Sequence, residues 1–118
     1  MNRQRIVAII RDIEGYFSDL GHINIDDLKD KTKFYSTSMI MLSIVNRAID
    51  VAEEIVADKK LGFPTRYREI FILLRDEQII DENLCQDMLE LVHFRNAAAH
   101  EYQTFKKEDV FKAYQKIY

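Results

Sequence analysis

The stretch MIMLSIVNRAIDVAEEIV, residues 39–56, decides the fold because it carries apolar side chains on more than one face of a helix. At helical spacing these side chains form two stripes, one of Leu42, Val45, Ile49, Ala52 and Val56 and the other of Met41, Ile44, Ala48, Val51 and Ile55. A helix that is apolar over much of its circumference must be covered on several sides. The stretch therefore predicts the central helix of a bundle. A more specific alternative is that one face of this helix also forms a subunit interface.

The composition around this stretch favours helices throughout. The chain has 118 residues, 47% of them hydrophobic, and contains only three glycines and one proline. A chain of this length is within the usual size of one domain, and so few turn residues disfavour a sheet protein. We expect an all-α fold, an up-and-down bundle of four main helices plus a short C-terminal helix, formed by one domain that spans residues 1–118.

Periodicity and capping residues predict the limits of these helices. A helix of about 50 Å from residue 27 to 60 would be unusually long, so we expect a break near the hydroxyl-rich segment YSTS. The expected helices cover residues 2–20, residues 26 or 27 to about 60 with a break near 35–38, a third starting at Thr65, a fourth starting near Asp81, and residues 107–118.

Charge and cysteine usage limit the functional classes. The net charge is −3, and proteins that bind nucleic acid non-specifically are usually basic, so a role on nucleic acid must rest on a local site. The single cysteine, Cys85, cannot form an intrachain disulfide and has apolar neighbours, which predicts a small buried hydrophobe. The longest apolar runs are too short for a signal peptide or a membrane span. We expect a soluble, cytoplasmic protein that does not bind membranes.

A second stretch, FRNAAAHEYQ at residues 94–103, places polar side chains on a largely apolar helix. On a helical wheel Arg95 and Tyr102 continue an apolar stripe, whereas Asn96 and His100 lie one turn apart on another sector. Burying such groups without partners costs about 1–3 kcal/mol each. The pattern therefore predicts that a site satisfies them.

One straight helix cannot aim both Arg95 and His100 at the same atom, because they point about 140° apart. Three arrangements would solve this: the helix ends before His100, the arginine side chain curls around, or a second copy of the chain completes the site. The run of three alanines, 97–99, favours the last, since small side chains let another helix approach closely. A homodimer with paired sites follows as a hypothesis.

The pattern R-N-x-x-x-H-x-Y, formed by Arg95, Asn96, His100 and Tyr102, resembles the motif of HepT-like toxins in the HEPN ribonuclease superfamily. The segments AIDVAEEIV and GFPTRYREIF precede it in the order that this family shows, so the resemblance covers nearly the whole chain. It implies a metal-independent endoribonuclease that acts on RNA and not DNA, without a cofactor, at a site formed across a homodimer. It also implies a toxin whose partner is a cognate antitoxin, a minimal nucleotidyltransferase of the MntA kind.

The chemistry of these side chains agrees with that implication. RNA carries its own nucleophile, the 2′-hydroxyl, so a base and a cation can suffice. His100 suits general acid–base work at neutral pH, Arg95 suits the phosphate, and Asn96 could hold the imidazole or a phosphate oxygen. In the family that it resembles, the tyrosine at the position of Tyr102 receives AMP from the antitoxin, which would block an incoming phosphate.

Two questions stay open at this level. Asn46, Asp50 and Glu53 align on one face of the central helix and are candidates for supporting the site, although such a row is usually just a solvated face.

The second open question is a rival function, a non-catalytic helical binding subunit of a nucleotidyltransferase complex. Six acids between Asp76 and Glu90 give it weight, because they would repel RNA. Against it stands a basic rim that Lys59, Lys60, Arg66, Arg68, Lys106, Lys107, Lys112 and Lys116 could form.

Overall fold

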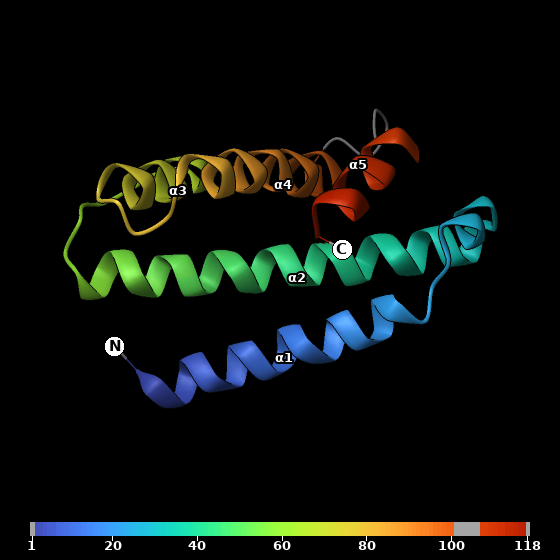
Figure 1. Cartoon of the computed structure of the whole chain (residues 1–118), viewed down its shortest axis with the longest axis horizontal. Helices are drawn as coiled ribbons and strands as arrows, with labels where there is room; N and C mark the ends of the chain where they lie inside the picture. The colour runs from blue at the N-terminus through green and yellow to red at the C-terminus, as the bar shows by residue number, and fades with distance from the viewer. Residues whose placement is uncertain (1, 101–106, 118) are drawn as a thin grey trace.

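The computed structural model describes residues 2–100 and 107–117 of the chain. Its elements are α1 (Arg3–Gly21), the 3-10 helix η1 (Ile25–Lys29), α2 (Lys31–Asp58), α3 (Tyr67–Asp76), α4 (Glu82–His100) and α5 (Lys107–Ile117). No strand occurs in these ranges, and the predicted all-α bundle is confirmed (Figure 1). None of the described helices is long and apolar enough to cross a membrane.

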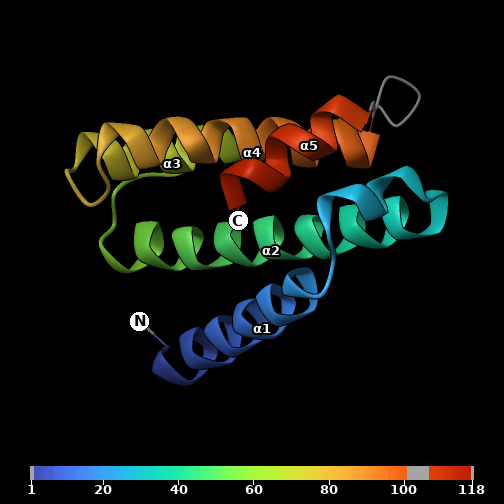
Figure 2. The ribbon, with the colours of Figure 1, turned by 45° about the vertical axis from the view of Figure 1, so that its right-hand side comes forward.

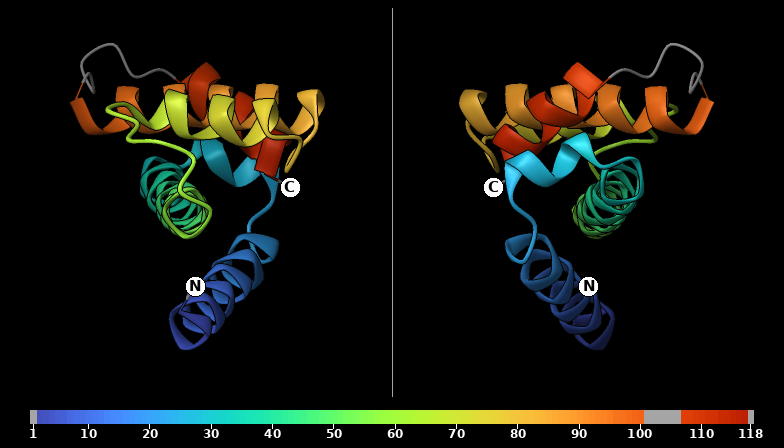
Figure 3. Two further views of the ribbon diagram at one scale, coloured as in Figure 1. Left: turned by 90° about the vertical axis from the view of Figure 1, so that its left-hand side faces the viewer. Right: turned by 90° about the vertical axis from the view of Figure 1, so that its right-hand side faces the viewer.

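The helix α2 is the centre of the bundle, as the apolar stripes predict. It contacts α1, η1, α3, α4 and α5, whereas α1 packs only on α2 within the described part of the chain. The end views show α1 on one side of α2 and the layer of α3, α4 and α5 on the other (Figure 3), and a turned view shows the same division (Figure 2). The buried residues of α2 are Phe34, Thr37, Ser38, Met41, Ile44, Val45, Ile49, Ala52 and Val56.

The predicted break near residues 35–38 is wrong, because α2 runs without interruption from Lys31 to Asp58. The hydroxyls expected to disturb the helix donate to carbonyls one turn back: Thr37 Oγ1 to Lys33 O at 2.7 Å, and Ser38 Oγ to Phe34 O at 2.8 Å. The interruption lies earlier, at Asp30, whose carboxylate accepts from the backbone N–H of Lys33 and starts α2. The hydroxyls are therefore satisfied inside the helix instead of ending it.

The starts of the next two helices follow from their caps. Asp81 accepts a hydrogen bond from the backbone N–H of Leu84 at 2.7 Å, so α4 begins where predicted. The helix α3 begins at Tyr67, two residues after the predicted Thr65, whose N–H and hydroxyl instead donate to the Glu69 carboxylate. The last predicted residue of α5, Tyr118, lies outside the described residues.

Cys85 is the small buried hydrophobe that its neighbours predict. Its side chain is fully buried on α4, and its Sγ lies 3.6 Å from the carbonyl oxygen of Phe71 on α3. Burial raises the pKa of the Cys85 thiol. The residue therefore packs α3 against α4 as an unreactive group.

Two methionines on α2 provide a matched test of this packing. Met41 is fully buried, whereas Met39, two positions earlier, is 62% exposed. We expect Met41→Ala to lower the free energy of unfolding by about 2–5 kcal/mol, because it leaves a cavity in the core. Met39→Ala should change it by less than about 0.5 kcal/mol. Urea unfolding followed by circular dichroism measures both, and equal effects would contradict the central position of α2.

Candidate functional site

Arg95 on α4 is the centre of the candidate site, and three helices contribute its contacts. Its Nε donates to Asn46 Oδ1 on α2 at 3.3 Å, and its Nη1 donates to Asn96 Oδ1 at 3.2 Å. Its guanidinium carbon lies 4.7 Å from the ring centroid of Tyr67, the first residue of α3. A cation over a tyrosine face is attracted by the ring quadrupole. The guanidinium is thus held by two amide oxygens and an aromatic ring.

Core packing on either side fixes the elements that carry these groups. Phe94 and Ala97, which flank the pair Arg95 and Asn96 on α4, are buried. On α2, the neighbour of Asn46 is the fully buried Val45. The arginine therefore lies on a rigid helix at the junction of α2, α3 and α4, half-buried between them.

The charge of Arg95 is not neutralised within the described part of the chain. Arg5, Arg47 and Arg75 each form an ion pair with a carboxylate, whereas Arg95 contacts two neutral amides and a ring among the described residues. An arginine offers a planar fork of donors that matches phosphate and carboxylate oxygens. The arrangement leaves a positioned cation that can bind an anion.

The structure separates the three candidates on α2 from one another. Asn46 contacts Arg95, as described above. Asp50 instead accepts from Arg47 Nη1 at 3.1 Å, and Arg47 also pairs with Asp12 of α1 at 3.3 Å. Glu53 is exposed and lines a groove that Tyr67 also borders. Of the three residues aligned on this helical face, only Asn46 contacts Arg95.

The structure also removes one of the three arrangements considered for Arg95 and His100. The helix α4 continues through His100, which excludes the arrangement in which the helix ends before this residue. Three helices pack around α4, which explains why it continues this far. The side chain of His100, and Tyr102 as a whole, lie outside the described residues.

Sequence reasoning missed Tyr67. This residue lies inside the segment GFPTRYREIF, 28 positions before Arg95 in the sequence. The aromatic residue at the start of an amphipathic helix was the available signal, but a cation–π contact depends on how two helices cross. Only the packing of α3 against α4 brings the two side chains together.

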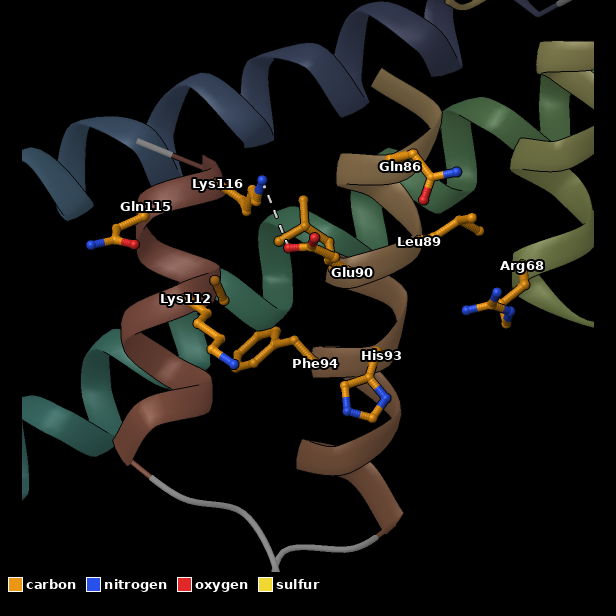
Figure 4. Close-up of a pocket in the computed structure, with 11 residues that line it drawn as sticks. Arg68, Gln86, Leu89, Glu90, His93, Phe94, Lys112, Gln115 and Lys116 are labelled. Atoms are coloured by element: carbon orange, nitrogen blue, oxygen red, sulfur yellow. Dashed lines mark ion pairs between the residues drawn. The ribbon is translucent and has the colours of Figure 1, made fainter. Parts of the chain in front are cut away.

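The predicted basic rim divides into two hollows in the described structure. One, of about 700 Å³, lies between the second half of α2 and the α2–α3 connection, and Lys60 and Arg66 line it. The other, of about 580 Å³, lies between α4 and α5 and extends to Arg68 on α3 (Figure 4). In the second, Lys112 is exposed, whereas Lys116 pairs with Asp87 and Glu90. Lys106 and the side chain of Lys107 lie outside the described residues.

The fold is one found in solved toxin–antitoxin complexes. One chain of the complex of tri-AMPylated Shewanella oneidensis HEPN toxin with MNT antitoxin superposes with a TM-score of 0.83, at 24% sequence identity over 99% of this chain and 96% of that one. The cytosolic protein YutE of Bacillus subtilis, of unknown function, superposes with a TM-score of 0.84 at 16% identity, over 99% of this chain and 82% of YutE. These likenesses establish the architecture.

Sequence comparison identifies the family. The family described as ribonuclease HepT-like matches residues 6–118, and the chain belongs to this family. The mRNA nuclease HepT of Shewanella oneidensis is 36% identical over 55 residues. That match spans 47% of this chain and 41% of the relative's length. The resemblance seen in the motif of Arg95, Asn96, His100 and Tyr102 is thereby confirmed at the level of the family.

The contact between Arg95 and Tyr67 predicts a measurable coupling energy. In a double-mutant cycle with Arg95→Met and Tyr67→Leu, we expect a coupling of about 0.5–1 kcal/mol in the free energy of unfolding. The same cycle between Arg95→Met and Tyr35→Leu is the control, because Tyr35 is an exposed residue near the start of α2 that has no contact with Arg95. Its coupling should be zero within error. Equal values in the two cycles would argue against the cation–π contact.

Proposed function

We propose that this chain, acting as one HepT-like unit over residues 1–118, is the toxin of a toxin–antitoxin pair and cleaves RNA without a metal or cofactor. The observation that carries the proposal is Arg95, a cation that has no carboxylate partner in the described part of the chain and is held by Asn46, Asn96 and Tyr67. It stands five positions before His100 in the motif of a ribonuclease family. The relative with mRNA nuclease in its name supports RNA as the substrate class.

In the proposed reaction His100 removes the proton of a ribose 2′-hydroxyl, whose oxygen then attacks the adjacent phosphorus. The bond from phosphorus to the 5′-oxygen breaks, and that oxygen takes up a proton. Arg95 stabilises the negative charge that develops on the phosphoryl oxygens. The products carry a 2′,3′-cyclic phosphate and a 5′-hydroxyl. DNA lacks the 2′-hydroxyl and is therefore not a substrate.

We further propose that the active form is a homodimer. Because α4 continues through His100, this residue and Arg95 leave one helix about 140° apart. In a dimer, Arg95 of one copy and His100 of the other can reach the same phosphate. Ala97 is already buried within the protomer and Ala98 is half-buried, so only part of the alanine run remains for a close helix contact.

The antitoxin in this proposal is a nucleotidyltransferase that modifies Tyr102. Transfer joins the phenolic oxygen to the α-phosphorus of ATP, releases pyrophosphate and frees the phenolic proton. The added AMP places bulk and negative charge two positions after His100, which repels an incoming phosphate. Support comes from the tri-AMPylated toxin in one solved complex and from AMP-PNP in another toxin–antitoxin structure of similar fold.

The first test incubates purified protein, shown by mass to carry no AMP, with total cellular RNA in excess EDTA. We expect discrete fragments that end in cyclic phosphate, and we expect His100→Ala to lower the rate by about 10²–10⁴-fold, the usual contribution of a general base. Intact RNA from unmodified wild-type protein would favour the non-catalytic binding subunit.

Two variants of α2 serve as matched controls in the same assay. Asn46→Ala removes the amide that accepts from Arg95, whereas Asp50→Ala removes a carboxylate that pairs with Arg47 instead. We expect Asn46→Ala to lower kcat/KM by more than about tenfold and Asp50→Ala to leave it nearly unchanged. A loss below tenfold for Asn46→Ala would remove this residue from the site.

A mixing experiment tests the shared site. Arg95→Ala and His100→Ala should each be inactive alone, because each lacks one essential group in both copies. If the site takes Arg95 from one protomer and His100 from the other, randomly mixed dimers should recover about a quarter of wild-type activity. Denaturation and joint refolding of the two variants allows exchange, and each variant refolded alone is the control. No recovery, together with a monomer by sedimentation at micromolar concentration, would contradict the dimer.

A further inference from the structure

Phe63 is the most exposed large hydrophobic residue in the described structure. Its side chain is 99% exposed, whereas the next most exposed, Met39, reaches 62%. It lies in the connection between α2 and α3, between Gly62 and Pro64. Gly62 has φ +146°, a conformation that L side chains rarely adopt, and Pro64 fixes its own φ. The residue just before the exposed ring thus has a backbone conformation that favours glycine.

This ring borders the hollow between α2 and the α2–α3 connection, which we call the loop groove. Its polar wall carries two cations, Lys60 and Arg66, and one acid, Glu53. Neither cation forms an ion pair with any residue that the structure describes. Its apolar wall includes Ile70 of α3. The groove thus combines two unpaired positive charges with exposed aromatic surface.

The loop groove is continuous with the candidate site through Tyr67. One side of this residue lines the groove, and its ring face lies 4.7 Å from the guanidinium carbon of Arg95. A chain whose phosphate binds Arg95 could therefore extend along α2 toward Phe63. Figure 1 shows the α2–α3 connection running from the end of α2 to the start of α3.

We propose that the loop groove is a subsite for an unpaired nucleotide of the RNA substrate, one whose base stacks on Phe63 while Lys60 and Arg66 contact its phosphates. This inference rests on the proposed ribonuclease function. Stacking on an exposed aromatic beside a basic groove is how proteins bind single strands without reading their sequence. A volume of about 700 Å³ is within the usual range for a small-molecule site.

The local chemistry favours RNA over a protein partner at this place. Protein interfaces have an apolar centre from which charged residues are depleted. Around Phe63 the charged lining of the groove is two cations that pair with no described residue and one acid, Glu53, and its threonine, Thr65, already bonds to Glu69 through its backbone N–H and hydroxyl. A single ring in a basic setting matches one base and its phosphates.

The test measures RNA binding separately from cleavage, in the His100→Ala background. A fluorescent single-stranded oligoribonucleotide is titrated in EDTA and followed by anisotropy. We expect Phe63→Ala to raise Kd by about tenfold, from the loss of one stacked base, and Phe63→Trp to retain the affinity. Met39→Ala, which removes another exposed apolar side chain at the far part of α2, should leave Kd unchanged.

The contribution of Lys60 and Arg66 is measured separately, from the salt dependence of RNA binding. The double variant Lys60→Gln and Arg66→Gln should reduce the slope of log K against log salt by about 1.4, or about 0.7 for each lost phosphate contact on a single strand. The variant Lys31→Gln, which removes an exposed cation at the first residue of α2, is the matched control and should leave this slope unchanged.

The outcomes separate the two proposals. If wild-type protein cleaves RNA but Phe63→Ala binds and cleaves as well as wild type, the subsite is overturned and the ribonuclease proposal stands. If unmodified wild type neither binds nor cleaves RNA, both fall. If Phe63→Ala weakens dimerisation or antitoxin binding while RNA binding is unchanged, the ring is a protein contact and the inference is wrong. Unchanged thermal unfolding of Phe63→Ala establishes that a loss of binding is not a loss of fold.

Discussion

The packing of every other described element on α2 is the constraint on which the rest of the structure depends. Every other described element contacts this helix, and Thr37, Met41 and Val45 on it are fully buried. Its charged and amide residues lie on the parts of its surface that these neighbours leave at least partly uncovered. Asn46 is one of them, and its amide oxygen accepts a hydrogen bond from Arg95 of α4. The position of the site is thus a consequence of how the central helix is covered.

Sequence patterns predicted the helices well where a short-range interaction sets their limits. Asp81 starts α4 by accepting a hydrogen bond from a backbone N–H three residues away, and α1 ends at Gly21, one residue after its predicted end. The predicted helix break at residues 35–38 is wrong, because whether the hydroxyls there end the helix depends on their burial in the fold. Thr37 and Ser38 are buried, so their hydroxyls have no water to bond and turn to carbonyls of the same helix. Hydroxyl content alone cannot distinguish this from a helix break.

The candidate site shows the same limit. The motif identified Arg95 and Asn96, and helical spacing proposed Asn46 and Asp50 as equals. Which of the two reaches Arg95 is decided by a competing cation, Arg47, which draws Asp50 toward itself and pairs with Asp12 of α1. Tyr67 could not be predicted at all, since its contact depends on the crossing of α3 and α4. Spacing along one helix assigns residues to a face, but partners on other helices assign their roles.

The acidic segment that first argued against RNA binding has its own explanation in the structure. Asp76 and Glu82 both pair with Arg75, and Asp87 and Glu90 both pair with Lys116. Asp81 accepts the capping hydrogen bond of α4. Five of the six acids between Asp76 and Glu90 are thus engaged locally, by cations or by a helix terminus. Their long-range repulsion is reduced by these partners and by salt. A chain of net charge −3 can therefore still present Lys60, Arg66 and Arg95 without a carboxylate partner among the described residues, because most acids of this segment have local partners of their own.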